Sequence, residues 1–483
     1  MVNKFNSNYF IIIAISFSLF FGVLLRLYNL NYENLWFDEM VSFWVSEPFI
    51  SFEDSYARNS SAEGTPFLFN FLLKNLHEIF GYHSHIGRYF SATFSILSIL
   101  SMAYLSISLK KNNSFVLVIF LVSFNVFLIK YAQEARVYSF VFFLSTITIF
   151  FLIKLLTTSN NRNKKIINSL FYIIFQILAV MAHPFTLLIF FSLIFYYFLY
   201  FIKTKKNLIF LNYTILTISL ILFIYLSIYF SDRVQHPDSW VGNPELKFYT
   251  NFYFSSFFGS RILGLMHLVT LITLIFYYKK EIINKLNPKT LLIIIIFLTY
   301  FIPIIYGYMI RPVIFSRYIM FVLIPVIILL SYLIFEIKND KIKKSLIIFF
   351  VTITFANQFT EYNFKQFYKE RPKFKIDYSS AVKFINDSNY KNYFINHSLN
   401  AKEKIWSHVF NNYLSIFTKE KKIDIKQMNL SDLKNKKGFV WIICPKEFFK
   451  KECEKIGTNQ KFKFKVLEDV EFNSLNLKLI KLE

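Results

Sequence analysis

The segment Tyr9–Leu25 reads YFIIIAISFSLFFGVLL and contains no charged residue. A second segment, Leu291–Phe301, reads LLIIIIFLTYF and is equally apolar. A bilayer core about 30 Å thick needs roughly 20 apolar residues in a helix that crosses it. Such segments recur along the chain of 483 residues, which is 55% hydrophobic and only 17% charged. This composition excludes a soluble enzyme, a disordered chain and a disulfide scaffold, and it predicts a polytopic α-helical membrane protein.

Apolar segments of this length predict about eleven transmembrane helices. We expect them near residues 9–28, 86–108, 114–131, 136–157, 167–182, 184–202, 208–230, 257–278, 289–308, 317–336 and 345–361. The segment 167–202 can form two spans only if the chain turns at Ala182-His183-Pro184. The first span resembles a signal peptide but is followed by no clear cleavage site, so we interpret it as uncleaved.

The net charge of +24 does not indicate nucleic-acid binding, because no basic face with exposed aromatic residues can be separated from the membrane pattern. One alternating set of loops is rich in basic residues, such as Lys110-Lys111 and Lys203, whereas the opposite loops hold most of the acids. The positive-inside rule then places the N-terminus in the cytoplasm. We therefore expect a multi-pass protein in contact with membrane lipids.

The composition changes near residue 370, so we expect a transmembrane module at 1–370, with a long first outer loop at 29–85, and an extracytoplasmic α/β domain at 371–483. Within this domain, charged stretches alternate with short apolar runs such as Tyr393–Ile395 and Gly438–Cys444. The pattern of Phe439–Ile443 is typical of a buried strand and that of Tyr378–Asn386 of an amphipathic helix. The only cysteines, Cys444 and Cys453, both lie there. An oxidising compartment would permit a disulfide between them, and the sequence leaves this open.

The first outer loop carries two adjacent carboxylates, Asp38 and Glu39, shortly after the first span. One could act on a substrate while the other binds a partner or a metal. The alternative is an interfacial loop with Trp36 as an anchor and solvated acids. Further along the loop, Glu63 precedes Thr65-Pro66, and Arg88 opens the second span; either residue could instead be structural.

The segment Tyr131–Tyr138, YAQEARVY, falls in a short outer turn between two spans. Ionisable residues at the membrane, here Glu134 and Arg136, are costly and usually functional. The alternative is an ion pair that fixes a helical hairpin. His183 lies at the end of an apolar segment and could bind a phosphate or an acceptor, or simply pack there. Arg317, followed by Tyr318, could bind an oxyanion or extend harmlessly toward water.

Together, these acids and arginines are expected at the outer boundary of the membrane, as a reaction on a membrane-anchored phosphate substrate would require. Their order also resembles that in the GT-C-fold glycosyltransferases that use polyprenyl-phosphate-linked sugars, the group of protein O-mannosyltransferases and lipid A aminoarabinose transferases. The resemblance is to the bacterial branch of this group, which implies the plasma (inner) membrane of a bacterium. The resemblance rests on the following motifs: Asp38-Glu39, Thr65-Pro66-Phe67-Leu68-Phe69, Gly87-Arg88-Tyr89, Gln133–Tyr138, His183-Pro184-Phe185, Arg317-Tyr318 with Pro325, and Asp377-Tyr378. Two positions depart from the family pattern, Thr65 in place of a proline and Pro184 in place of an aromatic residue.

The resemblance implies a GT-C-like bundle and transfer of a sugar from a polyprenyl-phosphate carrier to a glycan, lipid or protein acceptor on the outer face, with inversion. It implies that Asp38 is the catalytic base. Glu39 and Glu134 would orient the acceptor or hold a divalent cation. The carrier and substrate would be bound by Glu63, Arg88, Arg136, Tyr138, His183, Arg317 and Tyr318. No zinc site with the usual ligands is visible.

Two other functions are open. A flippase or transporter for lipid-linked saccharides should place ionisable residues at the midplane of its helices and show repeated halves, and neither is seen here. An oligosaccharide polymerase or ligase would transfer from a pyrophosphate carrier, and we would expect it to have a larger outer loop late in the chain. Because the lipid-phosphate bond already activates the sugar, no nucleotide site is needed, and the sequence contains no P-loop or dinucleotide-binding fingerprint.

Overall fold

The computed structural model shows a chain of two compact units. The helical unit comprises Met1–Tyr28, Ser51–Leu73 and Gly87–Glu370, and the sheet unit comprises Asn29–Ile50, Lys74–Ile86 and Arg371–Glu483. The composition placed the whole first outer loop with the membrane region, whereas two pieces of that loop pack with the C-terminal residues. The structure describes residues 2–109, 113–158, 161–205, 209–231, 241–283, 286–359, 363–370, 375–388, 393–397, 438–445 and 464–482.

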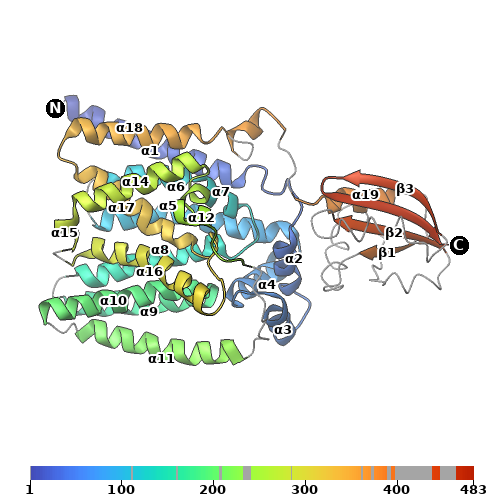
Figure 1. Cartoon of the computed structure of the whole chain (residues 1–483), viewed down its shortest axis with the longest axis horizontal. Coiled ribbons are helices and arrows are strands. Elements are labelled where there is room, and N and C mark those ends of the chain that lie inside the picture. The colour runs from blue at the N-terminus through green and yellow to red at the C-terminus, as the bar shows by residue number, and fades with distance from the viewer. Residues whose placement is uncertain are drawn as a thin grey trace. The chain divides into compact units, whose positions relative to one another are not determined.

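The helical unit is a bundle whose long helices lie side by side (Figure 1). Its helices are α1 (Val2–Leu27), α3 (Phe52–Ala62), α6 (Ser114–Ser123), α7 (Val126–Ala132), α8 (Tyr138–Thr157), α9 (Arg162–Ala182), α10 (Leu187–Thr204), α11 (Ile209–Ser231), α12 (Leu246–Asn251), α13 (Phe254–Phe257), α14 (Arg261–Tyr277), α15 (Lys279–Ile283), α16 (Pro288–Met309), α17 (Leu323–Glu336) and α18 (Asp340–Ala356). Short 3-10 turns are η1 (Pro184–Thr186), η2 (Met320–Val322) and η3 (Phe364–Phe367). Helices α4 (Leu68–Phe80) and α5 (Ser84–Leu109) have residues in both units.

Among the described residues, seven helices are long and apolar enough to cross a membrane, or up to eight if the bent pair α6–α7 forms one span. Two further apolar helices, at Arg261–Tyr277 and Met320–Glu336, are shorter. The protein is therefore a multi-pass membrane protein, and the number eleven stays a prediction. The expected turn at His183 is confirmed, because α9 ends at Ala182 and a 3-10 turn starts at Pro184.

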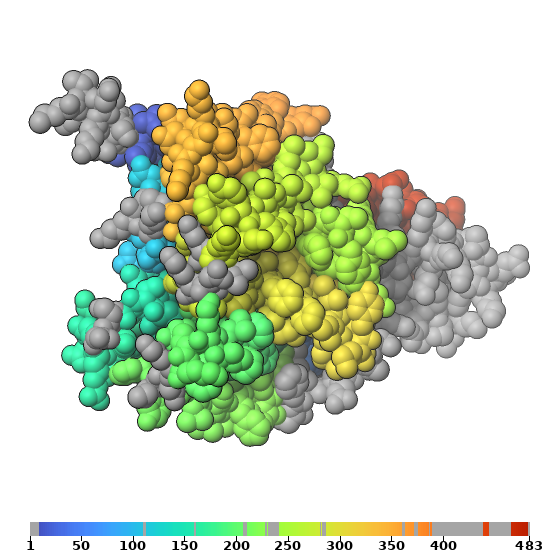
Figure 2. Space-filling model, turned by 60° about the vertical axis from the view of Figure 1, so that its left-hand side comes forward, coloured from blue at the N-terminus to red at the C-terminus, as the bar shows by residue number. Residues whose placement is uncertain are grey.

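The helical unit exposes large apolar side chains on its flanks. Figure 2 shows one such flank, with α10 in green, α14 in yellow-green and α18 in orange. The side chains of Phe198, Phe276 and Ile348, one from each of these helices, are all exposed. Continuous apolar surface of this kind is unfavourable in water and matches the hydrocarbon of a bilayer.

A bend of 54° separates α6 from α7, and a buried arginine satisfies the backbone there. Arg26 of α1 donates hydrogen bonds to the carbonyl oxygens of Val122 and Ser123, each at 3.0 Å. These carbonyls belong to the last turn of α6, which leaves its carbonyl groups without helical partners. On the other side of the bend, Asn125 caps α7, where its side chain accepts a hydrogen bond from Leu128 N. Side chains of Arg26 and Asn125 thus satisfy backbone groups on both sides of the break.

The sheet unit contains α2 (Phe37–Val45), α19 (Tyr378–Asp387), β1 (Tyr393–His397), β2 (Gly438–Pro445), β3 (Phe464–Phe472) and β4 (Leu475–Leu482). The strand order is β1-β2-β4-β3, with β1 parallel to β2 and the other pairs antiparallel. The strand expected at Phe439–Ile443 and the helix expected at Tyr378–Asn386 are confirmed as β2 and α19. Strand β2 is central, and its Val440–Ile443 stretch is buried. The question of a disulfide lies outside the described residues.

Candidate functional site

The turn between α7 and α8, Gln133–Val137, is held by backbone and side-chain contacts from three helices. Gln133 Nε2 donates to the carbonyl of Leu25 at 2.9 Å, which joins the turn to α1. Ser91 Oγ of α5 donates to the carbonyl of Arg136 at 3.1 Å. Ser139 Oγ of α8 donates to the carbonyl of Tyr131 in α7 at 3.0 Å, which joins the two helices that flank the turn. The turn is therefore fixed in place, as a binding or catalytic segment needs to be.

Glycine at position 87 lets α5 approach this turn. A Cβ atom at Gly87 would lie 2.7 Å from the Cβ of Ala135, which is closer than carbon atoms pack. The next residue, Arg88, is buried. Glu134 lies in the same turn and is also buried. The structure thus brings the predicted residues Arg88, Glu134 and Arg136 onto two neighbouring segments of the helical unit.

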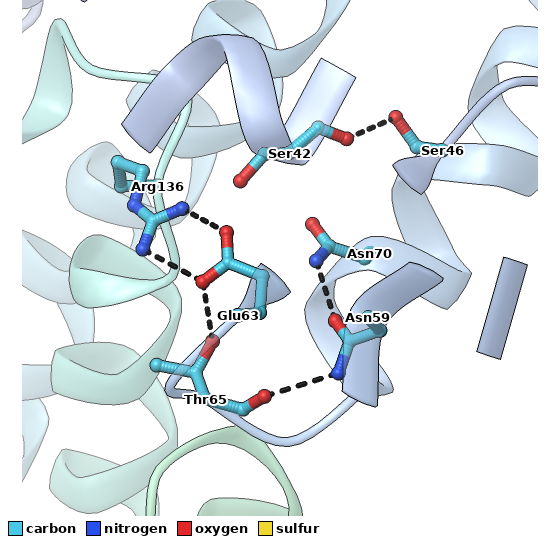
Figure 3. Close-up of polar contacts among 7 residues, drawn as sticks. All are labelled: Ser42, Ser46, Asn59, Glu63, Thr65, Asn70 and Arg136. Atoms are coloured by element: carbon cyan, nitrogen blue, oxygen red, sulfur yellow. Dashed lines mark hydrogen bonds and ion pairs between the residues drawn. The ribbon is translucent and has the colours of Figure 1, made fainter. Parts of the chain in front are cut away.

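Arg136 and Glu63 form a buried ion pair with two contacts (Figure 3). Arg136 Nη2 lies 3.0 Å from Glu63 Oε2, and Nη1 contacts the other carboxylate oxygen. The two side chains are only 6% and 4% exposed. A guanidinium and a carboxylate in this fork geometry make a strong, directional pair. The ion pair considered from the sequence was within the hairpin, between Glu134 and Arg136, whereas the structure pairs Arg136 with Glu63, at the end of α3.

A chain of amide contacts holds the loop that carries Glu63. Asn59 Nδ2 donates to the carbonyl of Thr65 at 3.1 Å, and Asn70 Nδ2 donates to Asn59 Oδ1 at 2.8 Å. Figure 3 shows these residues beside the ion pair, with Asn59 from α3 and Asn70 from α4. Because the loop is anchored at both helices, the carboxylate of Glu63 is presented to Arg136 in a fixed position.

Arg317 lies among aromatic rings. Its Cζ atom is 5.2 Å from the ring centre of Phe315 and 5.6 Å from the rings of Tyr138 and Tyr318. A guanidinium over aromatic faces is stabilised by the ring quadrupoles, more so where water is excluded. The ring of His183 is 5.3 Å from that of Tyr318. The four predicted residues Tyr138, His183, Arg317 and Tyr318 thus form one cluster built from α8, the α9–α10 turn and the segment before η2.

His183 is uncharged in this cluster. Its burial, followed by the positive charges of Arg136 and Arg317, lowers the pKa of His183 to about 3. Its Nδ1 atom accepts a hydrogen bond from the backbone N–H of Phe185 at 3.3 Å, so the neutral ring carries its proton on Nε2. At neutral pH, His183 can donate one hydrogen bond but adds no positive charge. The cationic groups that act on His183 are Arg136, which is paired with Glu63, and Arg317.

Asp38 and Glu39 belong to the sheet unit, where both lie in the first turn of α2. Glu39 is completely buried, and its Oε2 atom accepts from Lys375 Nζ at 2.8 Å and from the backbone N–H of Trp36 at 3.2 Å. Asp38 is partly exposed. The two adjacent carboxylates therefore differ: Glu39 is held inside the unit, and Asp38 is accessible.

Lys375 was not predicted from the sequence. It is one of many lysines in a strongly basic tail, and no spacing distinguishes it from the others. The one feature of the sequence that could have drawn attention to Lys375 is its position two residues before Asp377, where a helix was expected to begin.

A divalent cation was expected as one role for Glu39 and Glu134. Across the described residues, no group of three or more His, Cys, Asp or Glu side chains is arranged to hold a metal ion. The carboxylate of Glu39 has an ammonium group as its close partner. Within the sheet unit, the residues around Glu39 thus fit an ion pair better than a metal site.

Neither a protein-family model nor a curated protein matches the sequence. Solved structures do match. ArnT from Cupriavidus metallidurans in the apo state is 8% identical with a TM-score of 0.61, and the match covers 98% of each chain. The same protein bound to undecaprenyl phosphate is 9% identical with a TM-score of 0.55, over 97% of this chain and 98% of that one. The chain has the GT-C fold.

A GT-C chain of a different kind matches less completely. The oligosaccharyltransferase of Archaeoglobus fulgidus, in a complex with Zn and sulfate, is 10% identical with a TM-score of 0.53, over 83% of this chain and 61% of that chain. The fold expected from the resemblance is confirmed. Sequence identities this low support a shared fold and nothing more. The function of this chain therefore has to be argued from its own residues.

Proposed function

We propose that the protein is a membrane glycosyltransferase that moves a sugar from a polyprenyl-phosphate carrier to an acceptor at the outer face of the plasma membrane. The observation that supports this most is the cluster around Arg317, whose guanidinium carbon lies 5.6 Å from the ring centres of Tyr138 and Tyr318. Fixed positive charge in a poorly solvated site suits a substrate with a phosphate group. The fold is also that of ArnT, which has been solved with undecaprenyl phosphate bound.

In the proposed reaction, a hydroxyl or phosphate oxygen of the acceptor attacks the anomeric carbon of the sugar. A bond forms between these atoms as the bond from the anomeric carbon to the phosphate oxygen breaks. The electron pair of the broken bond leaves with the polyprenyl phosphate, and a hydroxyl acceptor gives its proton to Asp38. A single displacement of this kind inverts the anomeric configuration. Asp38 suits the role of base because it is the accessible carboxylate of the pair.

The arginines are proposed to bind the carrier phosphate as it gains negative charge, and they are expected to differ. Both terminal nitrogens of Arg136 contact Glu63. Arg136 would therefore act on the phosphate through its positive charge and not through a two-point hydrogen-bonded contact. Arg317 lies among aromatic rings, and a guanidinium is the side chain best suited to bind an oxyanion in a fork geometry. Arg88 is proposed as a third contributor. Tyr138, His183 and Tyr318 would line the phosphate site, and Glu134 would orient the acceptor or hold a cation.

The test is turnover by the purified protein in detergent with a radiolabelled polyprenyl-phosphate sugar. Asp38→Asn should lower kcat about 100- to 10,000-fold, which is the usual contribution of a general base. Asp469→Asn is the matched control, because Asp469 lies in the same unit, is half exposed and pairs with Lys478 at 3.2 Å. Full activity of Asp38→Asn would remove Asp38 from the chemistry. Mass spectrometry of envelope glycans with and without the protein would identify the sugar and the acceptor class.

A further inference from the structure

The sheet unit contains a connection between its C-terminal part and the helix that carries Asp38. Lys375 Nζ reaches the buried Glu39 Oε2 at 2.8 Å, and the same oxygen accepts the backbone N–H of Trp36. A carboxylate at the third helical position that binds the N–H group before the helix fixes the first turn. Asp38 is the neighbour of Glu39 in that turn. The contact of Lys375 therefore bears directly on where Asp38 is held.

The segment Lys375–Asp377 is itself fixed at both ends. On one side, Asn34 Nδ2 donates to Asp377 Oδ1 at 2.9 Å. On the other side, Asn473 Nδ2 donates to the carbonyl of Lys375 at 3.0 Å, and Asp377 N donates to Asn473 O at 3.1 Å. Asn473 lies in the turn between β3 and β4. The backbone of Lys375 is thus held by the sheet, and its side chain is presented to α2.

We propose that Lys375 is a positioning residue for the transfer reaction: its ammonium group holds Glu39, and Glu39 holds the first turn of α2 that carries Asp38. The inference rests on the proposed role of Asp38 as the base. A completely buried carboxylate needs a partner of opposite charge. Without the lysine, the buried carboxylate of Glu39 loses the ammonium group that lies 2.8 Å from it, and we expect the first turn of α2 to shift. Misplacement of a reacting group by about 1 Å can cost about 100-fold in rate.

The first test compares Lys375→Met with Lys478→Met. The two lysines are 18% and 17% exposed, and each pairs with one carboxylate of the same unit. Lys375→Met should lower kcat about 10- to 100-fold and leave the KM for the radiolabelled carrier unchanged, because the proposed phosphate ligands belong to the other unit. Lys478→Met should leave both constants unchanged. A wild-type kcat in Lys375→Met would overturn the proposal.

The second test is rescue. In the double variant Lys375→Met, Glu39→Gln, the neutral amide still accepts the N–H of Trp36 but needs no cation. This variant should recover most of the kcat lost in Lys375→Met, and Lys375→Arg should keep a kcat close to wild type. A double variant no more active than Lys375→Met would show that the charge of Glu39 is not the reason for the loss.

Hydrogen exchange separates this inference from the proposed function. The backbone amides of Met40–Val45 in α2 should exchange faster in Lys375→Met and at the wild-type rate in Lys478→Met. Unchanged exchange in Lys375→Met would refute the positioning role whatever the enzyme assay shows. Conversely, if Asp38→Asn is fully active while α2 loosens in Lys375→Met, the role of Asp38 fails and the contact of Lys375 with α2 stands.

Discussion

Glu63 and Arg136 lie 73 residues apart in the chain and meet in a two-contact ion pair that is almost fully buried. Glu63 comes from the first outer loop and Arg136 from the turn between α7 and α8. The pair therefore joins two segments that carry three of the predicted site residues, Glu63, Glu134 and Arg136. Its strength follows from the exclusion of water, and the same exclusion makes loss of one partner costly.

Glu63→Gln should destabilise the protein strongly. It leaves the guanidinium of Arg136 buried beside a neutral amide, and breaking a buried pair in this way costs about 3–5 kcal/mol. The measurement is the Tm of the purified protein in detergent. Asp340→Asn is the control, because Asp340 pairs with Lys343 at 2.9 Å and is 76% exposed, and a pair at the surface contributes little to stability. Equal Tm values for the two variants would mean that the Arg136 pair is not stabilising.

Arg317→Ala should raise the KM for the polyprenyl-phosphate donor at least 10-fold, because a charge-assisted contact to phosphate is worth about 1.5–3 kcal/mol. Arg317→Lys should recover part of the affinity, since a point charge replaces the planar fork. Arg261→Ala serves as the control, because Arg261 is an exposed arginine at the start of α14. An unchanged donor KM in Arg317→Ala would show that Arg317 only anchors its segment.

His183 should make stability depend on pH. Its pKa is lowered from 6.5 to about 3 in the folded state, by burial first and then by Arg136 and Arg317. Between these values the unfolded chain binds a proton that the folded chain does not. Stability is therefore fully present above pH 6.5 and is lost progressively as the pH falls toward 3.

The measurement for His183 is the slope of Tm against pH from 7 to 4. His183→Asn should give a shallower slope than the wild type, even if its Tm at pH 7 is lower. His83→Asn, which changes an exposed histidine, should keep the wild-type slope. Parallel slopes for His183→Asn and the wild type would show that His183 does not titrate between the folded and unfolded states as described.

Gly87→Ala should lower both stability and activity, because the new methyl group would meet Ala135 at 2.7 Å. Overpacking of this kind costs about 1–3 kcal/mol, and here it displaces the turn that carries Glu134 and Arg136. Adding Ala135→Gly removes the facing methyl group and should restore the Tm and much of the activity. Gly242→Ala is the control, since a Cβ there would have no atom within 4 Å. A double variant as unstable as Gly87→Ala would point to another cause.

The orientation of the chain is testable with an epitope after Glu483. If the tail is extracytoplasmic, as the charge bias of the loops predicts, protease added to intact spheroplasts should remove the epitope. Digestion only after the cells are lysed would place the tail in the cytoplasm and reverse the proposed side of the reaction.

The sequence by itself determined the class of the protein and most of its elements. Long uncharged segments such as Tyr9–Leu25 can be stable only as helices in lipid, because a bilayer offers no hydrogen-bond partner to an open backbone. The pattern of apolar residues was also sufficient to predict strand β2, and the proline after His183 was sufficient to predict the turn of the chain there. These features depend on neighbouring residues, so the order of side chains along the chain is enough to predict them.

Only the tertiary structure determined which charged side chains form ion pairs with one another. Glu63 with Arg136, and Glu39 with Lys375, are separated by 73 and 336 residues, and nothing in the local sequence indicates which of many charges will meet. The sequence placed Asp38 and Glu39 together as two similar acids, whereas packing buries one and leaves the other accessible. The reason is physical: the cost of burying a charge depends on which opposite charge the fold brings beside it, and that is a property of the assembled helices and sheet.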